Sequence, residues 1–442
     1  MIAVIADDFT GAAELGGIGL RYGLQVEIAT GVQARLSRGD SPSPGSAPSP
    51  GSDPLSMSGK AADLLIISAD TRSMSEEEAG VEMERLTRAL LPLNPVFLYK
   101  KVDSVLRGHV AAEMDAHMRV LGLERALLVP ANPKLERTIR DGRYFLKGKP
   151  IHESSFADDP EFAIRSSEVR DMVRRAEAHV LRTADALPAS GIVVGEVTST
   201  ADLAAWAERL DEAAAAPASN PGVTGPAFAE GTPAFAGVPA FAKGTPAFAA
   251  GASGFFTAIL DKLHAQNLGS RQPPLYSALT SAHPGLIVCG STFEQSRDTI
   301  QKIHRKGGPV SYMPSHLAAL EPDAEADYER WAEEVVALIR NTGRAIVAVN
   351  PRSSVEGPRA ARMLRERTAR LVQKVLGRTA IRELFIEGGS TAYAILQQTG
   401  LHTFFPMEEM AAGVIRMRVG ENPGLSVTVK PGSYTWPASA GI

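Results

Sequence analysis

The chain has 442 residues, of which 44% are hydrophobic and 22% charged, with 46 basic and 50 acidic residues and a net charge of −4. This length predicts two or three domains with a sizeable core. The charge balance argues against a nucleic-acid-binding protein, whose basic residues would be clustered. A single cysteine, Cys289, excludes an internal disulfide and a cysteine-based zinc cluster, so we expect a reducing, cytoplasmic compartment. Neither an apolar run of about 18 residues nor a signal-peptide pattern occurs, so we expect no membrane partner.

Short apolar runs alternate with longer helical patterns along the chain. We expect strands at residues 2–6, 25–29, 64–68, 96–99, 126–129, 192–194, 286–288, 345–349 and 384–386. We expect helices at residues 76–91, 110–121, 167–181, 203–214, 293–305, 324–341 and 356–376. This alternation predicts an α/β fold with mostly parallel sheets flanked by helices. Ligands of such sheets bind at the carboxyl ends of the strands, so each strand–helix junction is a candidate site.

Two low-complexity segments interrupt this pattern. Residues 37–60 hold a Pro/Ser/Gly tract, which we interpret as a flexible surface loop because it has little to bury. Residues 217–251 repeat PAFA, with copies that begin at Pro226, Pro233, Pro239 and Pro246. We interpret this repeat as a duplicated loop that bulges from the surface, and a partner-binding strip is the alternative. Prolines near residues 268–284 mark a boundary, so we predict an N-terminal domain of residues 1–267 and a C-terminal domain of residues 284–442.

Two adjacent acids, Asp7 and Asp8, follow the first apolar run. Strand side chains alternate between faces, so we expect one acid to face the crevice while the other turns into the fold or caps the next helix. We assign the crevice to Asp7, whereas Asp8 either faces away or caps the helix from Gly11, with Thr10 as a second capping candidate.

Charged residues also follow the third and fourth apolar runs. Arg72 in the SADTRS stretch is suited to a bidentate grip on a carboxylate or phosphate, and a surface ion pair is the alternative. The YKKVDSVLRGH stretch brings Lys101, Asp103, Ser104 and Arg107 together. Its cations can neutralise an anionic substrate, and Asp103 could accept the proton of a substrate hydroxyl, as phosphoryl transfer to an alcohol requires.

A long polar segment, residues 131–160, follows the next strand. Its DGRYFLKGKP stretch predicts a hairpin with the glycines at the turns. His152 and Glu153 do not form a zinc motif, because residue 156 is Phe where the motif needs His. We interpret His152 as a hydrogen-bonded structural residue.

The second half of the chain contains two similar strand–turn–helix junctions, CGST at residues 289–292 and EGGST at residues 387–391. Backbone N–H groups and the helix dipole make such a turn an anion site. Two of them indicate a polyphosphate such as a nucleotide, and a third glycine element, VKPGS, covers residues 429–433. The spacing of the glycines matches neither a Walker A loop nor a GxGxxG fingerprint.

These motifs resemble those of the four-carbon acid sugar kinases over nearly the whole chain apart from the low-complexity segments. The stretches ADDFTGA, TRS, KKVDSVLRG and ANPKLERT…DGRYFLKGKPIHESSFADDP carry the resemblance. It implies an N-terminal domain that holds a four-carbon sugar acid, a C-terminal domain that holds ATP with Mg²⁺ on the nucleotide, and a cleft between them. The substrate-binding residues implied are Asp7, Arg72, Lys101, Val102, Asp103 and Ser104. The ATP-binding residues implied are Ser291, Gly388, Gly389, Ser390, Thr391 and Gly432.

The catalytic residues expected on this basis are Asp7, Lys101, Asp103 and Arg107. Arg72 and Lys101 would hold the substrate carboxylate, and either Asp7 or Asp103 would orient and deprotonate the attacking hydroxyl. We assign no metal ligand from the protein itself. We expect a small-molecule partner only, with no nucleic acid, and allow for a homodimer.

Three departures from the family pattern fall in the C-terminal half. Cys289 stands where the family has serine, Ser390 stands where it has Asp or Glu, and the PGSYT stretch at 431–435 replaces a Gly-Gly-Phe-Gly ending. These changes favour one alternative, a sugar-acid-binding regulator that has lost catalysis. The extra loop at 37–60 favours another, a kinase of a larger sugar acid.

Overall fold

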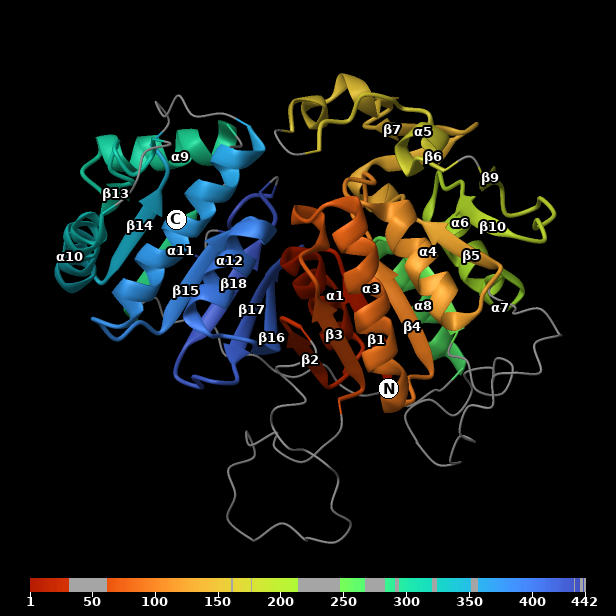
Figure 1. Ribbon diagram of the computed structural model, residues 1–442, viewed down its shortest axis with the longest axis horizontal. Helices are drawn as coiled ribbons and strands as arrows, with labels where there is room; N and C mark the ends of the chain where they lie inside the picture. The colour runs from red at the N-terminus through yellow and green to blue at the C-terminus, as the bar shows by residue number, and fades with distance from the viewer. Residues whose placement is uncertain are drawn as a thin grey trace, which may run out of the picture.

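The computed structural model describes residues 1–31, 62–159, 162–175, 177–213, 247–266, 283–290, 294–319, 324–350, 357–432, 434–437 and 440. We call the part up to residue 266 the first half and the part from residue 283 the second half, and the two lie side by side (Figure 1). The predicted loop at 37–60, the PAFA copies at Pro226, Pro233 and Pro239, and Ser291 lie outside the described residues.

The first half is a parallel sheet flanked by helices. Its strands, in sheet order, are β2 (Val26–Ala29), β3 (Leu64–Ser68), β1 (Ile2–Ala6), β4 (Phe97–Lys101), β11 (Ala247–Gly251), β5 (Arg125–Val129), β10 (Gly191–Gly195) and β9 (Ala178–Leu181). Its longer helices are α1 (Phe9–Arg21), α3 (Glu76–Leu90), α4 (Val110–Leu121), α6 (Thr200–Glu208) and α8 (Ser253–Gln266). All residues of β1 and β3 are buried, as expected for strands covered on both faces.

The second half is a mixed sheet with its own helices. Its strands, in sheet order, are β13 (Val310–Tyr312), β14 (Arg344–Ala348), β12 (Gly285–Cys289), β15 (Glu383–Glu387), β18 (Ser426–Lys430), β17 (Val414–Val419) and β16 (Thr403–Ala411). The first five are parallel, and β17 and β16 continue the sheet in antiparallel pairing. The helices are α9 (Glu294–Arg305), α10 (Glu325–Thr342), α11 (Pro358–Leu376) and α12 (Gly389–Thr399). Among the described residues, no helix has the length and apolarity needed to cross a membrane.

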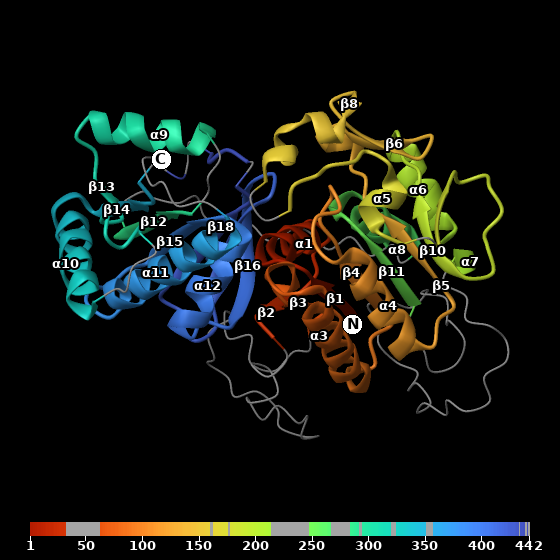
Figure 2. The ribbon, with the colours of Figure 1, turned by 45° about the horizontal axis from the view of Figure 1, so that its top comes forward.

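The two sheets join edge to edge into one 15-stranded sheet. Strand β16 pairs antiparallel with β2, through Thr403 opposite Ala29 and Phe404 opposite Ile28. Helix α1 covers this joint, and it packs against β16, β17 and α12 as well as its own half (Figure 2). The glycines of α1 allow the close approach, because a Cβ at Gly17 would lie 2.4 Å from the side chain of Ile415. Helix α1 therefore contacts both halves of the molecule.

The predicted hairpin in the polar segment is confirmed. Strands β6 (Arg137–Arg140), β7 (Arg143–Leu146) and β8 (Lys149–Pro150) form a separate small sheet. Its two turns place Gly142 and Gly148 at φ values of 75° and 76°, in the left-handed region that glycine tolerates best. In both views this segment rises beyond the large sheet on the same side as α9 (Figures 1 and 2).

Two predictions of secondary structure were wrong. Residues 167–181 do not form one helix, because Arg174 adopts a φ of 57° after the short helix α5 (Val169–Val173), and β9 follows. The PAFA tract is not a surface loop at its end, because Ala247–Gly251 forms the fully buried central strand β11. Strand β11 needs small residues, since a Cβ at Gly251 would lie 2.4 Å from the carbonyl oxygen of Val129. The predicted helix at 203–214 is divided into α6 and α7 (Leu210–Ala213).

Candidate active site at the junction of the two halves

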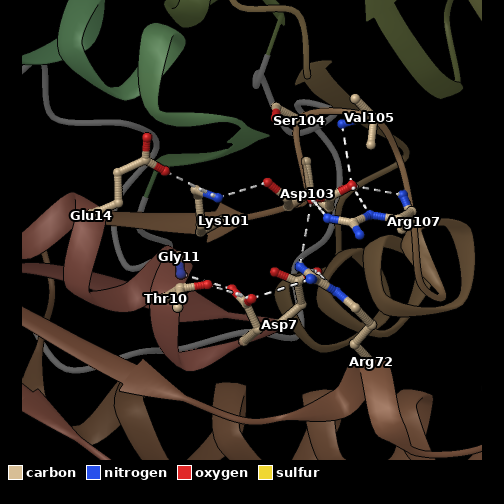
Figure 3. A network of polar contacts seen from close by, with 12 residues as sticks. Asp7, Thr10, Gly11, Glu14, Arg72, Lys101, Asp103, Ser104, Val105 and Arg107 are labelled. Atoms are coloured by element: carbon tan, nitrogen blue, oxygen red, sulfur yellow. Dashed lines mark hydrogen bonds and ion pairs between the residues drawn. The ribbon is translucent and has the colours of Figure 1, made fainter. Parts of the chain in front are cut away.

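The acids that follow β1 converge on one guanidinium. Arg72 donates from Nε (3.1 Å) and Nη2 (2.7 Å) to Asp7 Oδ2, and from Nη1 (3.1 Å) to Asp8 Oδ2 (Figure 3). Arg72 lies in η1 (Thr71–Ser73), just after β3, and β3 is the neighbour of β1 in the sheet. The shared carboxyl edge of two parallel strands thus brings residues 65 positions apart into contact.

The expected cap on α1 is present. Oδ1 of Asp8 accepts a hydrogen bond of 2.7 Å from the backbone N–H of Gly11, and Oδ2 accepts one of 2.7 Å from the Thr10 hydroxyl. The expectation that Asp8 faces away from Asp7 was wrong, since both bind Arg72. The physical reason is that β1 ends at Ala6, so strand alternation no longer applies to the two acids.

A second ion-pair group forms after β4. Arg107 binds Asp103 with two parallel hydrogen bonds, from Nε (2.9 Å) to Oδ2 and from Nη2 (3.0 Å) to Oδ1. Its third nitrogen donates to Asp159 (2.8 Å), and Arg72 Nη2 lies 3.8 Å from Asp103 Oδ1, which links this group to Asp7. The loop is held tightly, because the backbone N–H groups of Val105 and Arg107 also donate to Asp103.

The two lysines of β4 point to opposite faces of the sheet. Lys101 lies with the acids, where Nζ donates to the carbonyl of Val102 (3.0 Å) and lies 3.8 Å from Glu14 (Figure 3). Lys100 forms a fully buried ion pair of 2.9 Å with Glu113 of α4. The contact of Val102 with the cluster is through its backbone carbonyl, which accepts the hydrogen bond from Lys101, and its side chain is buried.

Some members of the cluster were not predicted as site residues. Arg137 of β6 donates to the hydroxyl of Ser104, and the Tyr144 hydroxyl donates to the carbonyl of the same serine. The guanidinium groups of Arg107 and Arg137 both lie over the ring of Phe156, at 5.2 and 5.5 Å from its centroid. Two sequence signals pointed to Arg137, its place in the polar segment after β5 and its place in the ANPKLERT stretch that carries the family resemblance.

The carboxyl groups of Asp7, Asp8 and Asp103 are all buried, but their pKa values are shifted in different directions. Burial raises the pKa of Asp7, with the neighbouring Asp8 adding to the effect and Arg72 opposing it. Burial also disfavours ionisation of Asp103, but Arg107 and Arg72 outweigh it and hold the pKa of Asp103 well below its usual range. For Asp8, Arg72 and Lys101 likewise outweigh burial, and its pKa is lowered. Oδ1 of Asp7 is buried and has no hydrogen-bond partner in the described part of the chain.

In the second half, the predicted phosphate turn leads into α12. Gly388 has a φ of 95°, and its N–H donates to the carbonyl of Lys430 at the end of β18 (2.9 Å). The first turn of α12 has neither a side-chain cap nor an acidic residue. Thr391 packs against the other glycine turn, since a Cβ at Gly290 would lie 2.2 Å from its Oγ1. Gly432 follows β18 at the same edge of the sheet.

A buried ion pair below this turn was not predicted. Glu387 Oε2 lies 3.0 Å from Lys430 Nζ, and neither side chain is exposed. Lys430 also lies 5.3 Å from the ring centroid of Trp436. The pair joins the carboxyl ends of β15 and β18, which carry Gly388 and Gly432. Burial, with the charge of Glu387, raises the pKa of Cys289 and keeps its thiol neutral.

The cluster of charged residues in the first half and the glycine turn of the second half meet at one point. A Cβ built on Gly389 would lie 2.5 Å from Oδ2 of Asp8 and 3.0 Å from Oγ1 of Thr10. Beside this contact is a cavity of about 700 Å³, whose lining includes Asp70, Ser73, Glu78, Arg362, Arg365 and Ser390. Both halves contribute to it, and its volume is typical of a small-molecule site. Within the described residues, no group of three or more potential ligand side chains is arranged to hold a metal ion.

The chain matches two family models in sequence. Residues 2–259 match a sugar-binding N-terminal domain, and residues 286–434 match a nucleotide-binding C-terminal domain. These matches define a protein built from a sugar-binding and a nucleotide-binding domain. The exact boundary between the two predicted domains stays a prediction.

Two relatives with described functions are similar over most of their length, and a third over about a third of its length. A D-threonate kinase of Salmonella typhimurium is 24% identical over 92% of this chain and 88% of its own. A 3-oxo-tetronate kinase of Methylobacterium radiotolerans is 26% identical over 98% of this chain and 96% of its own. A D-erythronate kinase of Heliobacterium modesticaldum is 30% identical over 40% of this chain and 36% of its own. The chain therefore belongs to the four-carbon acid sugar kinase family, whose members are phosphotransferases with an alcohol group as acceptor.

Solved structures share the fold. A Salmonella typhimurium protein, provisionally described as a tRNA synthase, superposes with a TM-score of 0.67 at 17% identity, over 98% of this chain and 96% of its own. A Haemophilus influenzae protein superposes with a TM-score of 0.62 at 17% identity, over 100% of this chain and 99% of its own. The predicted α/β architecture is thus confirmed.

Proposed function

We propose that the protein transfers the terminal phosphoryl group of ATP to a hydroxyl of a four-carbon sugar acid, of the threonate, erythronate or oxo-tetronate type. The observation that carries this proposal is the contact between Asp8 and Gly389. It puts the acid cluster of the first half directly beside the phosphate turn of the second half. The names of the relatives support the substrate class.

Asp7 is the better candidate for the base that accepts the hydroxyl proton. Its Oδ1 is buried and free of hydrogen bonds to described residues, and burial raises its pKa, which makes it a stronger base. Asp103 fits this role poorly, because both of its oxygens are held by Arg107 and its pKa is lowered. We assign Asp103 to fixing the positions of Arg107 and Arg72.

The cations of the cluster would hold the substrate. Arg72 presents a planar guanidinium after β3, and Lys101 lies at the end of β4, on the other side of β1, so both can bind a carboxylate at this edge of the sheet. Ser104 and Val102 would line the same site. None of these residues lines the cavity beside Ser390, so the proposal rests on the cluster itself.

The second half would hold ATP. The residues Gly388, Gly389, Ser390 and Thr391 form the first turn of α12, whose uncapped N–H groups suit phosphate oxygens. Gly432 lies at the adjacent strand end, and Ser291, which lies outside the described residues, stays a prediction. The residues present fit a nucleotide whose Mg²⁺ is held mainly by phosphate oxygens with at most one or two carboxylates.

The charge of the cluster supports a role for a metal cofactor. The cluster holds four cations, Arg72, Lys101, Arg107 and Arg137, against five carboxyl groups, those of Asp7, Asp8, Asp103, Asp159 and Glu14. Among the described residues of this cluster there is therefore no surplus of positive charge for a sugar acid and a triphosphate. Mg²⁺, when bound, supplies that neutralisation.

The direct test is a screen of four-carbon sugar acids with ATP and Mg²⁺, read by ADP release, with five- and six-carbon sugar acids included. Turnover of a four-carbon acid above all others is the expected result. Turnover of only a larger acid would favour the second alternative. ADP binding by calorimetry without any turnover would favour a regulator that has lost catalysis. The single cysteine, Cys289, cannot form an internal disulfide, which supports our proposal that the protein works in the reducing cytoplasm.

A further inference from the structure

The carboxylate of Asp8 lies where the N-termini of two helices meet. On one side it accepts the N–H of Gly11 in α1, and on the other it fills the space beside Gly389 at the start of α12. The hydroxyl of Thr10 and Nη1 of Arg72 fix Oδ2 from two further directions. Helix N-termini favour a negative charge, and the first turn of α12 supplies none of its own.

The start of α12 has no room to move closer to α1. A methyl group on Gly389 would lie 2.5 Å from Oδ2 of Asp8, a distance that carbon and oxygen atoms do not adopt without displacement. Asp8 is itself held by three donors and is 5% exposed, so it cannot simply rotate away. The separation of the two helix ends is therefore set by this side chain.

We propose that Asp8 is a positioning residue for phosphoryl transfer, and that its carboxylate fixes the phosphate turn of α12 at the correct distance from the acceptor. This inference rests on the proposed kinase function. Asp7, the candidate base, precedes Asp8 directly, and consecutive Cα atoms are about 3.8 Å apart. A shift of α12 away from Asp8 is thus a shift of the donor away from the acceptor, and a misplacement of about 1 Å can lower a rate by roughly 100-fold.

The variant Gly389→Ala tests the contact. Alanine suits a helix better than glycine, so any loss comes from the added methyl group. We expect kcat to fall at least tenfold while the Kd of the sugar acid, measured by calorimetry, stays within threefold of the wild-type value. Gly80→Ala in α3 is the matched control, because its Cβ would meet nothing closer than 3.9 Å, and it should leave both constants unchanged. Wild-type kcat in Gly389→Ala would overturn the proposal.

A double-mutant cycle shows whether the effect of Gly389→Ala depends on the side chain of Asp8. Asp8→Ser keeps a good N-cap for α1 but shortens the side chain that faces Gly389. In the Asp8→Ser background, Gly389→Ala should lower kcat by less than threefold. An equal loss in both backgrounds would mean that the glycine serves the approach of phosphate alone, and Asp8 would have no positioning role.

Thermal unfolding of the same four proteins distinguishes two kinds of failure. Gly389→Ala should lower the Tm only when Asp8 is present, and this readout needs no activity. Coupling in Tm without coupling in kcat, in an active enzyme, would overturn the positioning role and leave the proposed function intact. A wild-type protein that releases no ADP with any sugar acid would overturn the proposed function, and the positioning role with it.

Discussion

The two halves of the molecule carry different polar groups at the carboxyl ends of their strands. In the first half, charged side chains at the ends of β1, β3 and β4 hold one another in a buried network. In the second half, glycine turns present backbone N–H groups, and the one charged pair directly below the turn at Gly388, Glu387 with Lys430, is itself neutralised. Under the function that we propose, the comparison teaches that the first half would select a substrate by charge and shape, whereas the second half would offer a general phosphate cradle.

The largest expected effect is a loss of turnover caused by a substitution in the first half. Asp7→Asn should lower kcat by about 10²- to 10⁴-fold, because it removes the base, while the Kd of the sugar acid changes little. Steady-state kinetics and calorimetry on the same preparation measure the two quantities. If turnover survives in Asp7→Asn and is lost in Asp103→Asn, the roles that we assign to the two acids are reversed.

The next largest effect is a loss of stability caused by a substitution in the second half. Glu387→Gln leaves Lys430 as an unpaired buried charge, so we expect the free energy of unfolding to fall by about 3–5 kcal/mol. Urea unfolding followed by circular dichroism measures it. The double variant Glu387→Leu/Lys430→Met replaces the pair with apolar groups of similar volume and should recover most of the loss. A wild-type stability in Glu387→Gln would show that the pair is solvated and does not support the turn.

A smaller effect tests the strand hidden in the PAFA tract. Gly251→Ala forces a methyl group to within 2.4 Å of the Val129 carbonyl oxygen and 2.7 Å of the Tyr99 hydroxyl. Such overpacking should cost about 1–3 kcal/mol of unfolding free energy. The same measurement on Gly80→Ala serves as the control, and an equal stability of both variants would mean that β11 is not a tightly packed central strand.

The smallest effect concerns pH and sharpens the contrast between Asp7 and Asp103. The pKa of Asp7 is raised above its ordinary 3.8, so its stability contribution is greatest at low pH and is lost as pH rises through the raised value. The pKa of Asp103 is lowered, so its contribution is present above about 3.9 and is lost as pH falls below that value. Asp103→Asn should therefore cost more stability at pH 7 than at pH 3, and Asp7→Asn should not.

The acidic limb of the profile of kcat/KM against pH gives a second measurement of the contrast between Asp7 and Asp103. Activity should rise with pH through the raised pKa of Asp7, as the base becomes ionised. The residual activity of Asp7→Asn should lack this limb. A limb that is unchanged in Asp7→Asn would assign it to another group.

The sequence was most informative where local patterns decide the structure. Buried strands that end in charged residues placed Asp7, Arg72, Lys101 and Asp103 correctly at one edge of the sheet, because neighbouring parallel strands share that edge. Glycines marked the turns of the hairpin and of α12. The resemblance then indicated which half holds which ligand, and the family matches agree with it.

The sequence was least informative where contacts depend on distant segments. Strand β11 lacks the β-branched residues that signal a strand, and its place between β4 and β5 is set by tertiary packing. The pairing of Glu387 with Lys430 and the contact of Asp8 with Gly389 join positions 43 and 381 residues apart in the numbering. No local pattern marks either of them, so only the fold reveals them.

The pairing of β2 with β16 has a consequence for dissecting the protein. Each strand would be an unprotected sheet edge if its half were produced alone, and unpaired edge strands promote self-association. The isolated first half would also uncover Phe9, whose ring packs edge-on against Phe404 at 5.1 Å. We therefore expect the two halves to be poorly soluble as separate polypeptides and to recover solubility when they are co-expressed.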